Sequence, residues 1–228
     1  MLHPLFIYEP SRFEEQGKEV ALNSIPGVSG LLLAGGRSTR MGRDKRFLDV
    51  GGQPLIFRAL SVLEQIFEEV LISVAEPVEE LKETAHRIIP DRIPGCATLG
   101  GLLSGLEASH QSCVFAVACD MPFLNEALVR RMAEEAENAD VVMAKLSSGV
   151  QPMHALYSKA CVPYLEQMIA RHCLKLQALL DLPGLTIRVL EEESVRKVDP
   201  QLLSFMNVNT PADLEFARKT LAGHARQP

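Results

Sequence analysis

From residue 30 onward, short and almost wholly apolar runs alternate with amphipathic stretches, and this alternation is the strongest constraint on the fold. The apolar runs predict β-strands, and apolar residues recurring every three or four positions between them predict α-helices. We expect strands at Leu31–Ala34, Val70–Val74, Arg87–Ile89, Cys113–Ala118, Val141–Ala144 and Leu185–Leu190. We expect helices at Pro54–Phe67, Pro77–Ala85, Gly100–Ala108, Glu126–Glu137, Lys159–Ala170 and Pro211–Leu221.

Strands that are apolar on both faces and separated by helices predict an α/β fold, in which helices cover both faces of a mostly parallel sheet. In such a fold, ligands bind beyond the carboxyl ends of the strands. We assign residues 30–222 to one domain, residues 1–29 to an N-terminal appendage and residues 223–228 to a C-terminal tail. With 228 residues, of which 47% are hydrophobic, the chain is long enough to bury a large core without disulfides or metals.

Charge and cysteine content exclude several classes of protein. The net charge is −6 and no basic patch stands out, so we expect no binding to nucleic acid. The five cysteines are scattered, with neither a disulfide framework nor a CxxC zinc pattern, which favours a reducing compartment. No run is long and apolar enough to span a membrane, and no signal peptide is recognisable. We therefore expect a cytoplasmic protein without a membrane partner.

The first predicted strand leads into the most informative stretch of the sequence, LLAGGRSTRMGRDK, residues 32–45. Gly35 and Gly36 allow close approach of the backbone to a ligand, and Arg37, Arg40 and Lys45 can neutralise phosphate oxygens. The spacing matches neither a P-loop nor GxGxxG. The stretch therefore predicts a phosphate-binding loop of another kind, the alternative being a solvated basic loop with turn glycines.

The strand Cys113–Ala118 is followed closely by a single acid, Asp120, and by the rigid Met121-Pro122 turn. A carboxylate at the end of a strand is a hard oxygen ligand, and Mg²⁺ is often held by one protein carboxylate together with substrate phosphates and waters. We expect Asp120 to bind Mg²⁺. The alternative is that it caps the helix that starts near Asn125.

Two further segments contain candidate ligand-binding residues. Asp91 follows a strand, and Gly100-Gly101 opens the next helix, whose first N–H groups are suited to a nucleotide; equally, these glycines can be turn residues. Asn207 and Asn209 would project from one side of an extended strand and could complete a metal or phosphate site. The residues after them, Thr210-Pro211-Ala212-Asp213, have an ordinary helix-start pattern.

His154, in QPMHALY at residues 151–157, is the one polar residue of a predicted strand. It is expected to be half-buried with its hydrogen bonds satisfied, and we assign it no proton transfer. Neither a Ser/His/Asp nor a Cys/His arrangement can be argued from the order of residues.

Taken together, LLLAGGRSTRMGRDK, ACDMPF, PDRIPG with LGGLLSGL, QPMHALYS and MNVNTPADL resemble the nucleotidyltransferase family that includes molybdenum cofactor guanylyltransferase, the MobA type. The resemblance spans residues 30–221. It implies a Rossmann-like three-layer sandwich of the nucleotidyltransferase type. It also implies transfer of GMP from GTP to the terminal phosphate of molybdopterin or molybdenum-molybdopterin, with release of pyrophosphate.

Roles follow from the resemblance for the residues that match its motifs. Nucleotide binding would involve Leu33, Ala34, Gly35, Gly36, Arg37, Lys45, Asp91 and Asp120. Asn207 and Asn209 would lie on the pterin side, and Asp120 would hold Mg²⁺. The sequence departs from the family at two places: SVAEP at residues 73–77 lacks the usual asparagine after the second strand, and Ala97-Thr98 stands where Gly-Pro is common.

Such a reaction needs charge neutralisation more than proton transfer, because a phosphate monoester is already a competent nucleophile at neutral pH. We therefore expect Lys45, Arg40 and Asp120 to be the catalytic residues, with Arg37 and Mg²⁺ assisting the pyrophosphate leaving group. Further partners would be acceptor molybdoenzymes or their chaperones, and we expect a monomer.

Two alternatives remain at this point. One is a cytidylyl- or sugar-phosphate nucleotidyltransferase of the same fold, although in the resembling family a Gly-Gly pair such as Gly35-Gly36 goes with guanine. The other is a non-catalytic nucleotide-binding module, against which the presence of both Lys45 and Asp120 argues.

Overall fold

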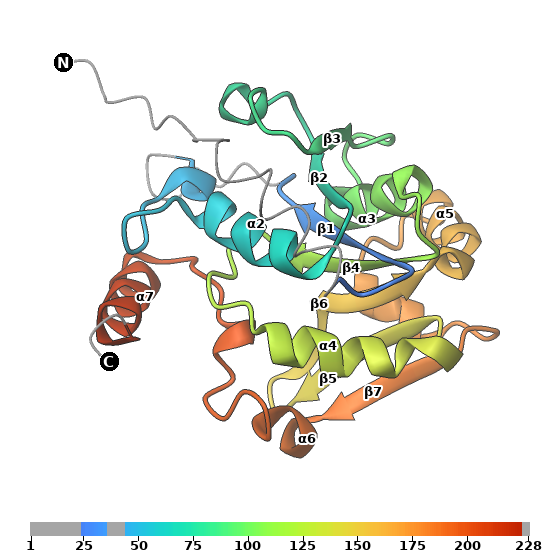
Figure 1. The fold of residues 1–228 in the computed structure, drawn as a ribbon. Helices are drawn as coiled ribbons and strands as arrows, with labels where there is room; N and C mark the ends of the chain where they lie inside the picture. The colour runs from blue at the N-terminus through green and yellow to red at the C-terminus, as the bar shows by residue number, and fades with distance from the viewer. Residues whose placement is uncertain (1–23, 36–43, 225–228) are drawn as a thin grey trace.

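The computed structural model describes residues 24–35 and 44–224 (Figure 1). Within them, one seven-stranded sheet has the strand order β3-β2-β1-β4-β6-β5-β7. Only β6 is antiparallel to its neighbours β4 and β5; the other pairs are parallel, which confirms a mostly parallel sheet. The strands are β1 (Val28–Leu33), β2 (Val70–Val74), β3 (Arg87–Pro90), β4 (Cys113–Ala118), β5 (Val141–Leu146), β6 (Gly149–Ser158) and β7 (Ile187–Glu191).

Helices cover both faces of the sheet and make the three layers that the alternating pattern predicts (Figure 1). One face is covered by α2 (Leu55–Ile66), α4 (Glu126–Glu134) and the short α6 (Glu192–Arg196). The other is covered by α3 (Ala97–Ala108) and α5 (Val162–Ala170). The last helix, α7 (Pro211–His224), packs through Leu214 and Ala217 on a small separate cluster.

Alternating side chains of β1 pack into the core on opposite faces of the sheet. Leu32 packs in the cluster that contains α2 and α4, whereas Leu31 and Leu33 pack in the cluster that contains α3 and α5. Gly105 explains the close approach of α3 to this strand, because a Cβ at Gly105 would come within 2.3 Å of the Leu31 side chain. The sheet is therefore buried on both sides at the strand that leads into the predicted phosphate loop.

Most predicted elements are confirmed within a few residues, but two expectations are wrong. Pro77–Ala85 forms only the 3-10 turn Glu79–Leu81, because Val78 and Leu81 are its only buried residues and so short an apolar face does not support a helix. Asn207 and Asn209 lie outside any strand, in the irregular segment before α7. β1 begins at Val28 and α7 ends at His224, each two residues beyond the expected domain limits.

The strand order reverses at β1, which has β2 on one side and β4 on the other. At such a point, connections from the two strands diverge to opposite sides and leave a crevice at the carboxyl edge of the sheet. Gly35 follows β1 and Asp120 follows β4 at this edge. None of the helices in the described ranges is long and apolar enough to cross a membrane.

Candidate functional site

Lys45 joins three distant segments of the chain at the carboxyl edge of the sheet. Its Nζ lies 2.6 Å from Asp120 Oδ2, although the two residues are 75 positions apart. The same ammonium donates to Asn209 Oδ1 at 3.0 Å, across 164 positions. Asn209 is held nearby because the N–H of Val208 donates to the Asp120 carbonyl at 2.9 Å. Lys45, Asp120 and Asn209 therefore form one cluster, which we call the lysine cluster.

The second carboxylate oxygen of Asp120 is free within the described part of the chain. Asp120 Oδ1 is buried and has no hydrogen-bond partner there. The helix-cap alternative for this residue is wrong, since Asn125 caps α4 by accepting the N–H of Leu128 at 3.1 Å. A buried oxygen of this kind needs a donor or a cation to offset its desolvation. Asp120 is thus suited to hold a hard cation, and no cluster of three or more His, Cys, Asp or Glu groups competes for it among the described residues.

A cavity of about 430 Å³ extends from the lysine cluster over β1 and β2 toward β3. It contains five of the predicted site residues, namely Leu33, Gly35, Lys45, Asp91 and Asp120. The two departures from the family pattern also border it, because Ala75, Ala97 and Thr98 are in its wall. The remaining lining residues are Ser73, Gly95, Gly101, Ala118, Cys119 and Met153.

Asp91 lies in the part of the cavity farthest along the sheet from Asp120. Its N–H donates to the Val74 carbonyl at 2.9 Å, and its Oδ1 accepts the Ser73 hydroxyl at 2.8 Å. The Asp91 carboxylate also approaches Gly35, where a Cβ would be 3.5 Å from Oδ2. The structure therefore brings together Asp91 and Gly35, two predicted nucleotide-binding residues, whereas Ser73 gave no functional signal in the sequence.

Arg46 is a second residue that the sequence did not single out. Its side chain is only 8% exposed, its Nη1 donates to the Ala34 carbonyl at 2.8 Å, and its Nε and Nη2 bind the Asp44 carboxylate. Ala34 and Asp44 flank the phosphate-loop motif on its two sides. Arg46 thus joins the two ends of that motif, and the sequence alone could not distinguish it from the other basic residues of the stretch.

Two predicted nucleotide-binding residues, Gly36 and Arg37, and the predicted catalytic residue Arg40 lie outside the described residues. Ala34 is fully buried and contributes through its carbonyl. The side-chain amide of Asn207 donates to the Phe205 carbonyl at 3.4 Å, whereas Asn209 accepts from Lys45. Of the two asparagines, Asn209 is the one that joins the lysine cluster.

Two buried side chains near the site have strongly shifted pKa values. Burial, aided by the neighbouring Asp120, raises the pKa of the Cys119 thiol to about 12. Burial lowers the pKa of His154 to about 4, against the opposing charge of Asp199. Both thiol and imidazole are therefore neutral at pH 7.

His154 is more deeply buried than the sequence predicts. It is fully inaccessible, lies between the rings of Phe115 and Phe205 with centroids 5.0 and 4.8 Å away, and has no partner for either ring nitrogen in the described chain. The expectation of a half-buried, hydrogen-bonded histidine is wrong, because β6 is a central strand covered on both faces. His154 is not part of the cavity wall, in agreement with the absence of an assigned proton transfer.

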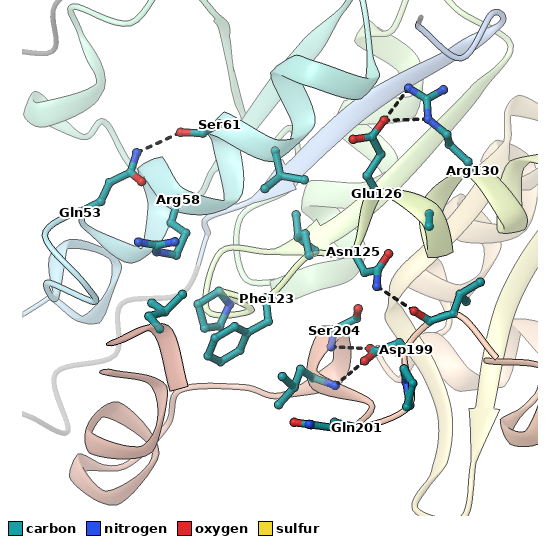
Figure 2. Close-up of a pocket in the computed structure, with 18 residues that line it drawn as sticks. Gln53, Arg58, Ser61, Phe123, Asn125, Glu126, Arg130, Asp199, Gln201 and Ser204 are labelled. Atoms are coloured by element: carbon teal, nitrogen blue, oxygen red, sulfur yellow. Dashed lines mark hydrogen bonds and ion pairs between the residues drawn. The ribbon is translucent and has the colours of Figure 1, made fainter. Parts of the chain in front are cut away.

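A larger and more open cavity of about 830 Å³ lies between α2, the start of α4 and the segment after α6 (Figure 2). Its polar groups are largely paired: Gln53 with Ser61, Arg130 with Glu126, and Asp199 with backbone N–H groups of residues 203 and 204. Phe123, three residues after Asp120, forms part of its wall. This cavity contains none of the predicted site residues.

Comparisons with known proteins agree on one relationship. Residues 30–189 match the family model described as the MobA-like NTP transferase domain. A probable molybdenum cofactor guanylyltransferase from Pelotomaculum thermopropionicum is 39% identical over 195 residues, 84% of this chain and 92% of that protein. A molybdenum cofactor guanylyltransferase from Desulfosudis oleivorans is 30% identical over 196 residues, 85% of this chain and 96% of that protein.

A solved structure has the same fold. The crystal structure of molybdopterin-guanine dinucleotide biosynthesis protein A from Archaeoglobus fulgidus superposes with a TM-score of 0.74 at 25% sequence identity. The match covers 86% of this chain and 99% of that one.

Proposed function

The chain belongs to the MobA-like NTP transferase family, and we propose that it transfers GMP from GTP to the terminal phosphate of molybdopterin or molybdenum-molybdopterin. The reaction forms a bond between the acceptor phosphate oxygen and the α-phosphorus of GTP and breaks the bond to the β-phosphate, so that pyrophosphate leaves. The product is the guanine dinucleotide form of the cofactor. The chain is accordingly a nucleotidyltransferase enzyme.

The lysine cluster is the observation that carries this proposal. Lys45 Nζ lies between a carboxylate and an amide at the carboxyl edge of the paired strands β1 and β4, at one end of a cavity that extends to Asp91. Two anionic substrates must meet in this reaction, and a fixed ammonium lowers their mutual repulsion. The Lys45 ammonium, together with a cation at Asp120, would supply positive charge where the α-phosphate and the acceptor phosphate meet.

No deprotonating base is needed at the site. A phosphate monoester is ionised at neutral pH and presents its own nucleophilic oxygen, and the residues that line the cavity include no histidine. The protein's contribution is to hold the two phosphates in line and to offset their charge. We propose that Asn209, whose amide oxygen is bound by Lys45, faces the acceptor side of the cluster.

Mg²⁺ fits the residues present. Asp120 Oδ2 is bound to Lys45, whereas the buried Oδ1 has no partner among the described residues. A cation bound to Oδ1 would provide that missing partner. One carboxylate together with nucleotide phosphates and waters is a common way to hold this ion. When bound, Mg²⁺ would withdraw charge from the phosphoryl oxygens and the leaving pyrophosphate. Lys45 would orient the Asp120 carboxylate and contact phosphate oxygens directly.

The nucleotide would occupy the arm of the cavity over β1, β2 and β3. We propose that Leu33, Gly35 and Asp91 contact the nucleoside, and that Gly36, Arg37 and Arg40 bind phosphates from outside the described residues. Ala34, which is buried and bound by Arg46, would hold this segment in place. We further propose that the enzyme acts as a monomer in the cytoplasm and passes its product to molybdoenzymes or their chaperones.

The direct test is an assay with purified protein, Mg²⁺, molybdopterin and nucleotide labelled at the α-phosphate. Label from GTP should enter a dinucleotide that contains the pterin, in step with pyrophosphate release, and label from CTP should not. Asp120→Asn should abolish the transfer, and Asp181→Asn, at an exposed carboxylate, should not. Transfer from CTP, or none from any nucleotide, would contradict the proposal.

A further inference from the structure

We propose that Ser73 is a positioning residue for nucleotide recognition: its hydroxyl orients the Asp91 carboxylate so that Oδ2 accepts a hydrogen bond from the nucleoside of GTP. The inference rests on the proposed function and extends it by naming the Ser73 hydroxyl as a group that controls recognition of the nucleoside. The donor on the nucleoside is either a ribose hydroxyl or the 2-amino group of guanine.

Ser73 and Asp91 are held together by two contacts between neighbouring strands. Ser73 lies on β2, is 1% exposed, and donates its hydroxyl to Asp91 Oδ1 at 2.8 Å. One residue further, the Val74 carbonyl accepts the N–H of Asp91 at 2.9 Å. The main chain therefore fixes the position of Asp91, and Ser73 fixes the rotation of its carboxylate.

The start of α3 leaves room for this arrangement. A Cβ at Gly101 would lie 2.6 Å from Ser73 Oγ and 3.4 Å from Asp91 Oδ1, closer to the hydroxyl than real Cβ atoms come. The absence of a side chain at Gly101 thus allows the serine hydroxyl to stay on the carboxylate. Gly101 lies in the second turn of α3 and lines the cavity, so it serves to make room for Ser73 and not to form a turn.

The other carboxylate oxygen is directed to the ligand side. Asp91 Oδ2 lies near Gly35 and Gly100, where added Cβ atoms would be 3.5 and 3.8 Å away, and no hydrogen bond to it is formed within the described residues. Asp91 Oδ2 is thus a hydrogen-bond acceptor beside Gly35 of the phosphate-loop motif. A carboxylate fixed before binding loses less rotational freedom when a donor arrives, which favours affinity.

The experiment measures dissociation constants in the presence of Mg²⁺ for GTP, ITP, 2′-deoxyGTP and 3′-deoxyGTP. The wild type is compared with Ser73→Ala and with Ser29→Ala, a matched serine that is 0% exposed and binds Glu69 at 2.6 Å. Ser73→Ala should weaken GTP about 5-fold, as expected for the loss of one net hydrogen bond. Ser29→Ala should leave all four constants unchanged.

The analogues identify the donor and separate positioning from general stability. For the analogue that lacks the group bound by Asp91, the wild type should already bind weakly and Ser73→Ala should add nothing. Ser73→Thr, which keeps the hydroxyl, should retain the wild-type pattern. An equal loss for all four nucleotides, or no loss for any, would overturn the inference.

Asp91→Ala provides a second route if Ser73→Ala does not fold. Asp91→Ala should bind GTP no more tightly than the analogue that lacks the group bound by Asp91. A variant that still prefers GTP over this analogue as strongly as the wild type does would overturn the inference. A wild type that binds CTP in preference to GTP would instead contradict the proposed function, so the two failures are distinguishable.

Discussion

Arg46 Nη1 lies 2.8 Å from the carbonyl oxygen of Ala34, while the rest of the same guanidinium binds Asp44. One planar group therefore ties Ala34, the residue that follows β1, to Asp44, the residue that precedes Lys45. Arginine suits this task because its five donors form a rigid fork, which a lysine ammonium lacks.

Arg46→Lys should consequently lower both stability and nucleotide affinity. The substitution would leave part of the contact to Ala34 or Asp44 unmade, and an unmade contact of a buried group costs about 1–3 kcal/mol. Urea unfolding measures the loss of stability, and titration with GTP measures the affinity. Arg188→Lys, at an exposed position on β7, is the control, and equal behaviour of the two variants would refute the role of Arg46.

Asp120→Asn and Lys45→Ala should fail in different ways. Asp120→Asn removes the proposed Mg²⁺ ligand, so kcat should fall about 10²–10³-fold, the magnitude typical for loss of one group that stabilises transition-state charge. Lys45→Ala should also weaken GTP binding, because Lys45 would contact the phosphates directly. Steady-state kinetics over a range of Mg²⁺ concentrations separate the two, and near-normal turnover of either variant would contradict its assignment.

Removal of divalent metal should reproduce the Asp120 phenotype. EDTA should reduce both turnover and the thermal stabilisation produced by GTP, since a ligand at 100 times its Kd adds about 2.7 kcal/mol to the free energy of unfolding. Excess Mg²⁺ should restore both. A GTP-induced shift that is unchanged by EDTA would show that the nucleotide binds without the ion.

His154 should give the protein an acid-sensitive stability. Its pKa in the folded state is about 4, below the ordinary value of 6.5, because burial opposes the charged form. Well above pH 6.5 the imidazole is neutral in both states, so its titration does not change the free energy of unfolding. As the pH falls from 6.5 toward 4, only the unfolded state takes up the proton, so stability falls by up to about 1.4 kcal/mol per pH unit.

The substitution His154→Leu should remove this part of the acid dependence. It should also leave stability at pH 7 equal or higher, because two unpartnered ring nitrogens are replaced by apolar atoms. The exposed His172, replaced by Asn, is the control. Unfolding measured from pH 4 to pH 8 tests the prediction, and an unchanged slope in His154→Leu would disprove it.

Cys119 should resist alkylation even though it borders the cavity. It is 6% exposed, and its pKa of about 12 keeps it almost wholly as the thiol at pH 8, whereas the thiolate is the reactive form. Iodoacetamide should label the exposed Cys173 first. Mass spectrometry of digested protein locates the label, and early modification of Cys119 would mean that this part of the sheet opens in solution.

The strands were predictable because their signals are local, and so were Lys45 and Asp120, which the structure brings together. The apolar run before Asp120 and the glycines and basic residues around Lys45 are patterns that one segment contains by itself. Ser73 and Arg46 were not predictable, since their roles depend on Asp91 and Ala34 being neighbours in space. The helix predicted at Pro77–Ala85 failed for a similar reason. The apolar spacing of this segment is helical, but the tertiary structure buries too few of its residues and only the 3-10 turn Glu79–Leu81 forms.

Asn209 contributes to the lysine cluster from a segment that follows every strand of the sheet. During synthesis, the sheet and both helical layers can therefore form before this part of the site has emerged from the ribosome. A product cut short after β7 would keep all seven strands and lose Asn209 from the lysine cluster. A fragment can therefore contain the complete sheet and still lack one member of the site.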